Sequence, residues 1–179
     1  GYVVTDIETA MQHCVEKLGI GPWFYIERLD VPDFEYMGHP SPVELSLALA
    51  NSGDMQIELI QQRNTAPSMY EDFQRAGRYH GVQHLGYGTY DWFHSIEAIL
   101  SEGHECVQQG TGGKRGRFAY FRPTLSQPFP PLIDDISVSG TVIEVMDLAH
   151  GRAELFAAIK AASVNWDGTA AIRTTLPEG

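Results

Sequence analysis

An internal repeat constrains the fold of this chain more than any other feature of its sequence. The opening stretch GYVVTD shares its Gly-Tyr pair and a following Asp, at the same spacing, with GYGTYD at residues 86–91. The pair Ile57-Glu58 corresponds at nearly the same offset to Ile143-Glu144. Because the two units agree at both ends, the chain is predicted to contain two copies of one structural module.

Each unit reads as a strand, a helix and three further strands. Asp6 and Asp91 are suitable helix N-caps, and apolar residues follow each at helical spacing. The predicted strands are GYVVT, WFYIERL, VELSLALA and MQIELIQ in the first unit, and HLGYGTY, a strand near 105–109, RFAYF and TVIEVMD in the second, with PDFEYMGHPSP as a loop. The expected fold class is α+β, with two paired βαβββ modules that form a curved mixed sheet around a cup and helices on the outer faces.

We expect a single domain over residues 1–179, with module one at about 1–62 and module two at about 82–148. The stretch RAELFAAIKAA predicts a helix at 152–162, within a C-terminal helix and tail at 149–179. A long Pro-rich loop at 123–139 precedes the last strand of module two.

Composition narrows the class of partner. The chain has 179 residues, of which 43% are hydrophobic, and a net charge of −11. This charge argues against nucleic acid, because phosphate binding needs a basic face, and no apolar run reaches the roughly 20 residues that span a bilayer. Cys14 and Cys106 match no zinc spacing, so a reduced cytoplasmic protein is expected, with no disulfide framework.

Strand alternation selects the side chains that enter the cup. In MQIELIQ, Ile57 and Leu59 share one face, and Glu58 lies on the other. The apolar pair is expected beneath a helix, which turns Glu58 toward the cup, and the repeat assigns the same place to Glu144. His84 shares its strand face with two glycines, which leaves room above the sheet.

In VELSLALA, the apolar set Val43, Leu45, Leu47 and Leu49 is expected to face a helix. That interpretation puts Glu44, Ser46 and Ala48 in the cup.

The cup is thus predicted to collect Glu44, Glu58, His84 and Glu144. Taken singly, a strand glutamate usually faces solvent and a strand histidine is usually an ordinary core or surface residue. Together, three carboxylates and an imidazole would repel one another and be costly to desolvate, and a divalent cation would relieve that cost.

Basic residues concentrate in GKRGRFAYFR at 113–122. One interpretation is a solvated loop and strand edge. The other is an anion site in which Lys114, Arg115 and Arg117, with the surrounding glycines, bind an acidic substrate.

These segments together resemble the vicinal-oxygen-chelate superfamily, also called the glyoxalase/bleomycin-resistance/dioxygenase fold, with the nearest likeness to its methylmalonyl-CoA epimerase-like and lactoylglutathione-lyase-like members. The stretches that carry the likeness are GYVVTDIETAM, VELSLALA, MQIELIQ, GVQHLGYGTYD, GTGGKRGRFAYFRP and GTVIEVMD. The epimerases often have His-His where this chain has Gln83-His84, and the Pro-rich segment is longer than usual.

The resemblance implies a divalent metal ion (Zn, Ni, Co, Mn or Fe) in the cup. Glu58, His84 and Glu144 fall on three of its four ligand positions, and the fourth is expected two residues before Gly1, outside this sequence. Glu44 matches a proton-transferring glutamate of the epimerases, and Glu144 can serve as both ligand and acid–base group. A homodimer is also typical of the family.

The leading functional hypothesis is a metal-dependent isomerase, epimerase or lyase that removes a proton next to a carbonyl of a small acidic or thioester substrate, through a metal-stabilised enediolate or enolate. Two alternatives stay open. An extradiol-type Fe(II) dioxygenase would use two histidines and one carboxylate with open positions, and a fourth protein ligand counts against it. A non-catalytic module of the same fold would bind a small molecule among the strand aromatics.

Overall fold

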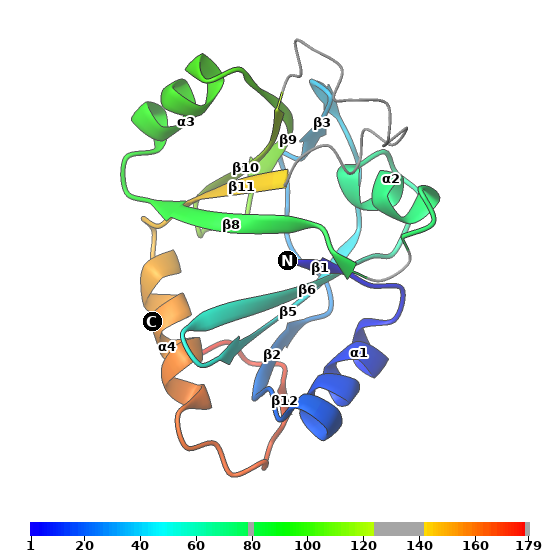
Figure 1. Cartoon of the computed structure of the whole chain (residues 1–179), viewed down its shortest axis with the longest axis vertical. Coiled ribbons are helices and arrows are strands. Elements are labelled where there is room, and N and C mark those ends of the chain that lie inside the picture. The colour runs from blue at the N-terminus through cyan, green and yellow to red at the C-terminus, as the bar shows by residue number, and fades with distance from the viewer. Residues whose placement is uncertain (79–80, 124–141, 178–179) are drawn as a thin grey trace, which may run out of the picture.

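The computed structural model describes residues 1–78, 81–123 and 142–177, and the Pro-rich loop predicted at 123–139 lies almost entirely outside them. These residues form two six-stranded mixed sheets, one above the other in Figure 1. The lower sheet has the order β12-β2-β5-β6-β1-β7 and the upper sheet the order β4-β3-β9-β10-β11-β8. The predicted α+β fold class is confirmed, and neither sheet closes into a barrel.

The strand bounds follow the sequence pattern closely. The lower sheet contains β1 (Tyr2–Val3), β2 (Trp23–Ile26), β5 (Leu45–Ser52), β6 (Met55–Gln62), β7 (Gly81–Val82) and β12 (Ile172–Arg173). The upper sheet contains β3 (Glu35–Tyr36), β4 (His39–Pro40), β8 (His84–Thr89), β9 (His104–Thr111), β10 (Arg117–Pro123) and β11 (Val142–Asp147). One prediction was wrong: the segment expected as a loop contains β3 and β4, which pair with each other and join β9 of the upper sheet.

The register of the parallel strand pairs confirms the repeat. In the lower sheet Tyr2 of β1 lies opposite Leu59 of β6, and in the upper sheet Tyr87 of β8 lies opposite Val145 of β11. Each module therefore places its glutamate, Glu58 or Glu144, at the same position relative to its first strand.

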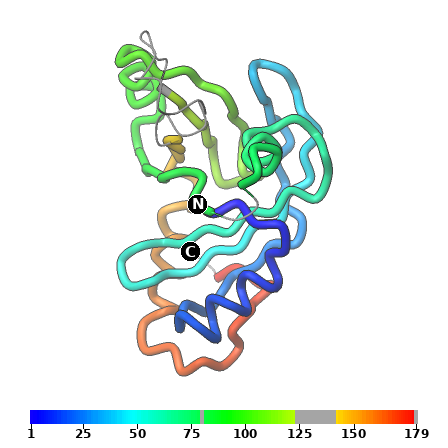
Figure 2. The backbone as a smooth tube through the Cα atoms, turned by 45° about the vertical axis from the view of Figure 1, so that its right-hand side comes forward, coloured from blue at the N-terminus to red at the C-terminus, as the bar shows by residue number. Residues whose placement is uncertain are grey.

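One of the places where the chain passes from one sheet to the other lies between β7 and β8, at Gln83. The backbone of Gly1 is hydrogen-bonded to this segment. Its amino group donates to the carbonyl of His84 (3.0 Å), and its carbonyl accepts from the amide of Gln83 (2.9 Å). Figure 2 shows the first residues of the chain entering at this point between the two sheets, with β6 and β7 on either side of β1.

Two helices cover the outer faces as predicted. In the lower module, α1 (Ile7–His13) begins at Asp6, whose side chain accepts from the amide of Thr9 (2.9 Å), and it continues as a short π-helical stretch, η1 (Cys14–Leu18). In the upper module, α3 (Trp92–Ser101) begins at Asp91. The apolar side of α1 packs on Ala48, Ala50 and Leu59, and that of α3 packs on Ala119, Phe121 and Val145.

The packing of the C-terminal helix α4 (Arg152–Ser163) shows that the side chains of β5 were assigned to the wrong faces. Leu49 of this strand packs with Leu155 and Ile159 of α4, and it lies directly opposite Glu58 in the sheet. The odd-numbered side chains of β5 therefore share the face of Glu58, whereas Ala48 lies beneath α1. The expectation that Glu44, Ser46 and Ala48 line the cup was wrong, because a helix packs on each face of β5 and strand alternation cannot tell the two faces apart.

A short helix between the modules, α2 (Met69–Arg75), was not predicted. Ser68 caps it by accepting from the amide of Glu71 (3.0 Å), and Gln108 of β9 accepts from the amide of Met69 (2.9 Å). Its Tyr70 is buried in the core between the two sheets, and its hydroxyl donates to that of Tyr120 on β10 (3.0 Å). The helix thus packs over this core, and hydrogen bonds that involve Ser68, Gln108 and Tyr120 hold it in place.

Both cysteines of the chain, Cys14 and Cys106, are free thiols, in agreement with the expected absence of a disulfide framework. Among the described residues no helix has the length and apolar character that crossing a membrane requires.

Candidate metal centre

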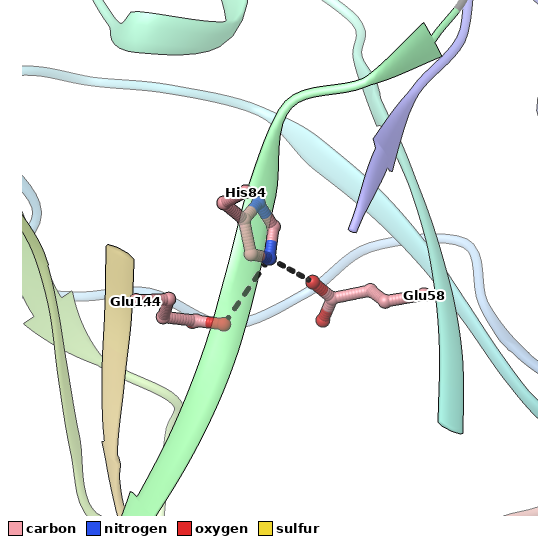
Figure 3. Close-up of side chains that lie close together, drawn as sticks. All are labelled: Glu58, His84 and Glu144. Atoms are coloured by element: carbon pink, nitrogen blue, oxygen red, sulfur yellow. Dashed lines mark ion pairs between the residues drawn. The ribbon is translucent and has the colours of Figure 1, made fainter. Parts of the chain in front are cut away.

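Three of the predicted ligands converge where the two sheets meet. Glu58 comes from β6, His84 from β8 and Glu144 from β11, as Figure 3 shows. The Nε2 atom of His84 lies 3.2 Å from a carboxylate oxygen of Glu58 and 3.2 Å from one of Glu144. The three ligand atoms all lie within 4.8 Å of one another. We call these three residues the triad.

The imidazole of His84 is held in one orientation. Its Nδ1 lies 2.7 Å from the side-chain oxygen of Gln83, so this nitrogen donates and Nε2 points at the carboxylates. The ring packs edge-on against Tyr120, with centroids 5.0 Å apart. On its other side it contacts Gly1, where a Cβ would come within 1.9 Å of Cε1, so the close approach requires glycine.

Burial and charge act against each other in the triad. Burial by itself lowers the pKa of His84, but hydrogen bonds and charges from Glu144 and Glu58 outweigh it and raise that pKa to about 9. For Glu144, burial raises the pKa, and the hydrogen bond and charge of His84, with the charge of Arg152, lower it overall. A proton on Nε2 therefore holds together, at neutral pH, the buried carboxylate of Glu144 and the partly buried one of Glu58.

The triad leaves one group unsatisfied. A single N–H on Nε2 cannot point well at both carboxylates, and the buried Oε2 of Glu58, although 3.2 Å from Nε2, receives no well-directed hydrogen bond from the described residues. One imidazole nitrogen and two carboxylate oxygens are a suitable donor set for a divalent cation, which would replace the proton and satisfy both oxygens at once. The residues present fit the metal that the sequence predicted.

Two buried tyrosines lie beside the triad, and sequence reasoning assigned neither to it. Burial raises the pKa of both Tyr70 and Tyr120 well above its usual value, and the charge of Glu144 adds to the effect. Their hydroxyls therefore stay protonated and act as donors next to the carboxylates. Tyr120 could have been found, because it lies directly opposite Glu144 in the sheet, whereas Tyr70 lies in the unpredicted α2.

Arg152 is the other residue that was missed. It is the first residue of α4, its side chain is buried, and its charge acts on both Glu144 and Glu58. Nothing in the sequence around it distinguishes it from an ordinary polar residue at a helix start.

The structure does not bring Glu44 to the triad. Its carbonyl accepts from the amide of Arg63 (2.7 Å), and the side chain is exposed. Leu49 is the residue of β5 opposite Glu58, and Glu44 precedes it by roughly 16 Å of chain at the usual rise of a strand. The catalytic role expected for Glu44 stays a prediction, and the geometry of the structure gives that role no support.

The predicted substrate-binding residues also lie away from the triad. Lys114 and Arg117 line a cavity of about 390 Å³ between the β9–β10 hairpin, the start of α3 and the end of β11. The guanidinium of Arg117 lies over the ring of Phe93, 5.2 Å from its centroid, while Arg115 donates to the carbonyl of Gly151 (2.9 Å). Arg117 shares its strand face with Ala119, which packs under α3. This cavity therefore opens on the outer side of the upper sheet.

Solved structures share this fold at low sequence identity. The methylmalonyl-CoA epimerase from Mycobacterium tuberculosis is 19% identical, with a TM-score of 0.56 over 86% of this chain and 88% of that one. A hypothetical protein from Bacillus halodurans is 19% identical, with a TM-score of 0.54 over 82% and 89%. A variant of the methylmalonyl-CoA epimerase from Streptomyces coelicolor, in complex with 2-nitronate-propionyl-CoA, is 16% identical, with a TM-score of 0.52 over 83% and 94%.

No curated protein matches the chain significantly in sequence. A family model does match, over residues 1–121, and its description is the Glyoxalase/Bleomycin resistance protein/Dioxygenase superfamily. The match spans the first module and most of the second, and it confirms the family that the repeat and its motifs suggested. The chain belongs to the glyoxalase/bleomycin resistance protein/dioxygenase superfamily.

Proposed function

We propose that this protein is a divalent-metal-dependent isomerase of the epimerase type, which moves a proton at the carbon next to a carbonyl of a small acidic or thioester substrate. The observation that carries the proposal is the triad itself. Its three ligand atoms lie within 4.8 Å of one another, and the buried Oε2 of Glu58, which is paired with His84, receives no well-directed hydrogen bond from the described residues. Membership of the superfamily and the fold shared with two epimerases support the same assignment.

Glu58, His84 and Glu144 are the residues that would hold the cation. When bound there, a divalent cation withdraws electrons from a coordinated carbonyl oxygen and makes the neighbouring C–H bond more acidic. Gln83 keeps the Nε2 lone pair of His84 available for a ligand bond, because its side-chain oxygen accepts from Nδ1.

Glu144 is the proposed proton carrier. Its pKa is lowered from the usual value, because His84 and Arg152 outweigh the effect of burial, so it is charged at neutral pH and able to accept a proton. The hydroxyl of Tyr120 also stabilises the charged form of this carboxylate. The buried rings of Tyr70 and Tyr120 keep water away from this side of the triad.

The two epimerases of the same fold suggest the first substrate to test. One is named for methylmalonyl-CoA and the other binds a propionyl-CoA derivative. We therefore take a CoA thioester of a branched dicarboxylic acid as the first candidate, and the hemithioacetal of methylglyoxal and glutathione as the second.

The test combines metal analysis with proton exchange. Metal-free protein is titrated with Zn²⁺, Co²⁺ and Mn²⁺, and each loaded form is incubated with methylmalonyl-CoA in heavy water while loss of the α-proton is followed by NMR. We expect exchange to depend on metal and to fall by roughly 10²–10⁴-fold in Glu144→Gln, the usual contribution of general acid–base catalysis.

Full exchange in Glu144→Gln would remove that residue from the mechanism. Failure of the native chain to bind any of the three cations would contradict the metal centre. Oxygen consumption with a catechol by the Fe²⁺-loaded form would favour the dioxygenase alternative instead.

A further inference from the structure

The basic hairpin between β9 and β10 lines a cavity that the proposed reaction does not use. This outer cavity has a volume of about 390 Å³, within the range of about 300–1,000 Å³ that is usual for small-molecule sites. It lies where β11 leads into α4, beside the first turn of α3 (Figure 1). Its lining combines two aromatic rings, two cationic side chains and one carboxylate, which belong to Trp92, Phe93, Lys114, Arg117 and Asp147.

Two arginines hold the backbone of this hairpin against the start of α4. Arg115 donates to the carbonyl of Gly151 (2.9 Å). Arg152 donates to the carbonyl of Gly116 (3.1 Å) and to that of Arg117 (2.7 Å). Because these bonds are made within the chain, the wall of the outer cavity is formed before any ligand arrives.

The two cations that line the cavity have no such partner. Within residues 1–78, 81–123 and 142–177, neither Lys114 nor Arg117 forms an ion pair, and both are exposed. Asp30 and Asp33 also approach the hairpin, but neither lines the cavity. An anion that enters the cavity therefore meets two unpaired positive charges in a chain whose net charge is −11.

Phe93 provides an aromatic surface beside these charges. The residue is 73% exposed, and the guanidinium of Arg117 lies over its ring, 5.2 Å from the centroid. The neighbouring Trp92 packs instead toward the core beneath α3. Aromatic rings and guanidinium planes are the two surfaces on which the bases of nucleic acids stack. A planar ring can therefore bind at this end of the cavity.

Asp147 adds an acceptor to the same cavity. Its Oδ1 accepts from the amide of Ala149 (2.9 Å), and its Oδ2 lies 3.9 Å from Nε2 of His150. An ionised carboxylate offers about four lone-pair positions, so it can accept further hydrogen bonds. Its charge would repel a simple anion but would bind a ligand whose hydroxyl or amino groups donate to it.

We propose that the outer cavity binds a nucleoside phosphate, with the phosphate at Lys114 and Arg117, the base against Phe93, and a hydroxyl or amino donor on Asp147. Inorganic phosphate would leave the ring and the carboxylate unused, and a neutral nucleoside would leave both cations unpaired. The site is separate from the triad and does not depend on the proposed function. A free nucleotide and the nucleotide end of a CoA thioester share this chemistry, and the experiment distinguishes them.

Calorimetry on metal-free protein tests the proposal, so that no ligand can bind through a cation at the triad. The protein is treated with EDTA and titrated separately with AMP, adenosine and inorganic phosphate. We expect AMP to bind about five-fold or more tightly than either of the other two, because only AMP uses both the aromatic surface and the two cations.

Two substitutions should affect these ligands differently. Phe93→Ala should weaken AMP binding by about five-fold or more, because stacking of the base is lost, and should leave phosphate binding unchanged. Lys114→Gln should weaken the binding of both AMP and phosphate by about three- to ten-fold, because a charge that contacts the phosphate is removed. The same variant should bind adenosine as the native chain does.

Tyr90→Ala and Lys17→Gln are the matched controls. Tyr90 is an aromatic residue that is 75% exposed, Lys17 is an exposed cation on η1 of the lower module, and neither lines the cavity. We expect both variants to bind AMP with native affinity. A thermal melt of all four variants confirms that each is folded.

The outcomes decide both the site and the source of its ligand. Absence of AMP binding by the native chain at millimolar concentration overturns the proposal, and so does an AMP affinity that neither Phe93→Ala nor Lys114→Gln changes. AMP binding no tighter than that of phosphate overturns the assignment to a nucleoside. CoA is finally titrated against bound AMP: displacement supports the nucleotide end of a CoA thioester as the ligand, and no displacement supports a free nucleotide. Because the protein is metal-free throughout, failure here leaves the metal centre untouched.

Discussion

In the first module Glu58 of β6 lies beside Leu49 of β5, whereas in the second module Glu144 of β11 lies beside Tyr120 of β10. Leu49 packs against α4. Tyr120 packs on His84 and stabilises the charged form of Glu144.

The difference shows what a sequence repeat determines and what it leaves to the surroundings. Both glutamates take the same backbone position relative to the first strand of their module. Their side chains are nevertheless exposed to different extents, 20% for Glu58 and 7% for Glu144, and the positive charge of Arg152 is felt by both. The charged form of Glu144 is stabilised by His84, Arg152 and Tyr120, whereas the buried Oε2 of Glu58 is paired with His84 without a well-directed hydrogen bond.

Removing the imidazole that both glutamates share should have the largest effect. In His84→Ala the buried carboxylate of Glu144 and the partly buried one of Glu58 lose their common partner, so we expect the free energy of unfolding to fall by about 3–5 kcal/mol. Urea unfolding of the metal-free protein at neutral pH measures this loss. His13→Ala, at an exposed position on α1, is the control and should change stability by less than about 0.5 kcal/mol. A loss below about 1 kcal/mol in His84→Ala would mean that the triad does not hold the two sheets together.

Replacing each of the two glutamates in turn by the neutral glutamine should show how differently they contribute to stability. We expect Glu144→Gln to lower the free energy of unfolding of the metal-free protein by about 2–3 kcal/mol, because it removes the more deeply buried of the two charged partners of His84. Glu58→Gln should cost about 1 kcal/mol or less, since that side chain is partly exposed and its removal relieves repulsion with Glu144. Both variants should lose Zn²⁺ affinity in calorimetry. Equal losses of stability in the two variants would show that Glu58 and Glu144 contribute alike to the stability of their modules.

Deleting one hydroxyl tests the support that only the second module provides. Tyr120→Phe keeps the ring against His84 but leaves the buried hydroxyl of Tyr70 without its acceptor, so we expect a loss of about 1 kcal/mol. Tyr87→Phe, on the exposed side of β8, is the matched control and should be neutral in the same urea titration. A neutral Tyr120→Phe would show that the hydroxyl pair is not a stabilising contact.

The parts of the fold that depend on local signals were predictable. Asp6 and Asp91 cap the two outer helices as their spacing indicated, and the repeat placed Glu58, His84 and Glu144 together. These features could be predicted because helix caps and strand alternation are each encoded within a few neighbouring residues.

The rest depends on contacts between distant segments. The strand β5 is apolar on both faces because α1 and α4 cover one each, so its alternation could not reveal which side faces the cup. The seven-residue α2 is held by Gln108, Tyr120 and Ser68, and its own sequence is too short to specify a stable helix. The homodimer and the ligand before Gly1 stay predictions.

The smallest expected effect concerns Glu44, and it tests the assignment of the side chains of β5 to the two faces of the sheet. Because its side chain is exposed and its carbonyl, not its carboxylate, contacts Arg63, we expect Glu44→Gln to change the free energy of unfolding by less than about 0.5 kcal/mol. Zn²⁺ affinity should also match that of the native chain, in contrast to Glu58→Gln. Calorimetry on the two variants side by side decides the matter. A loss of Zn²⁺ affinity in Glu44→Gln would mean that the start of β5 turns toward the triad in solution, as strand alternation alone first suggested.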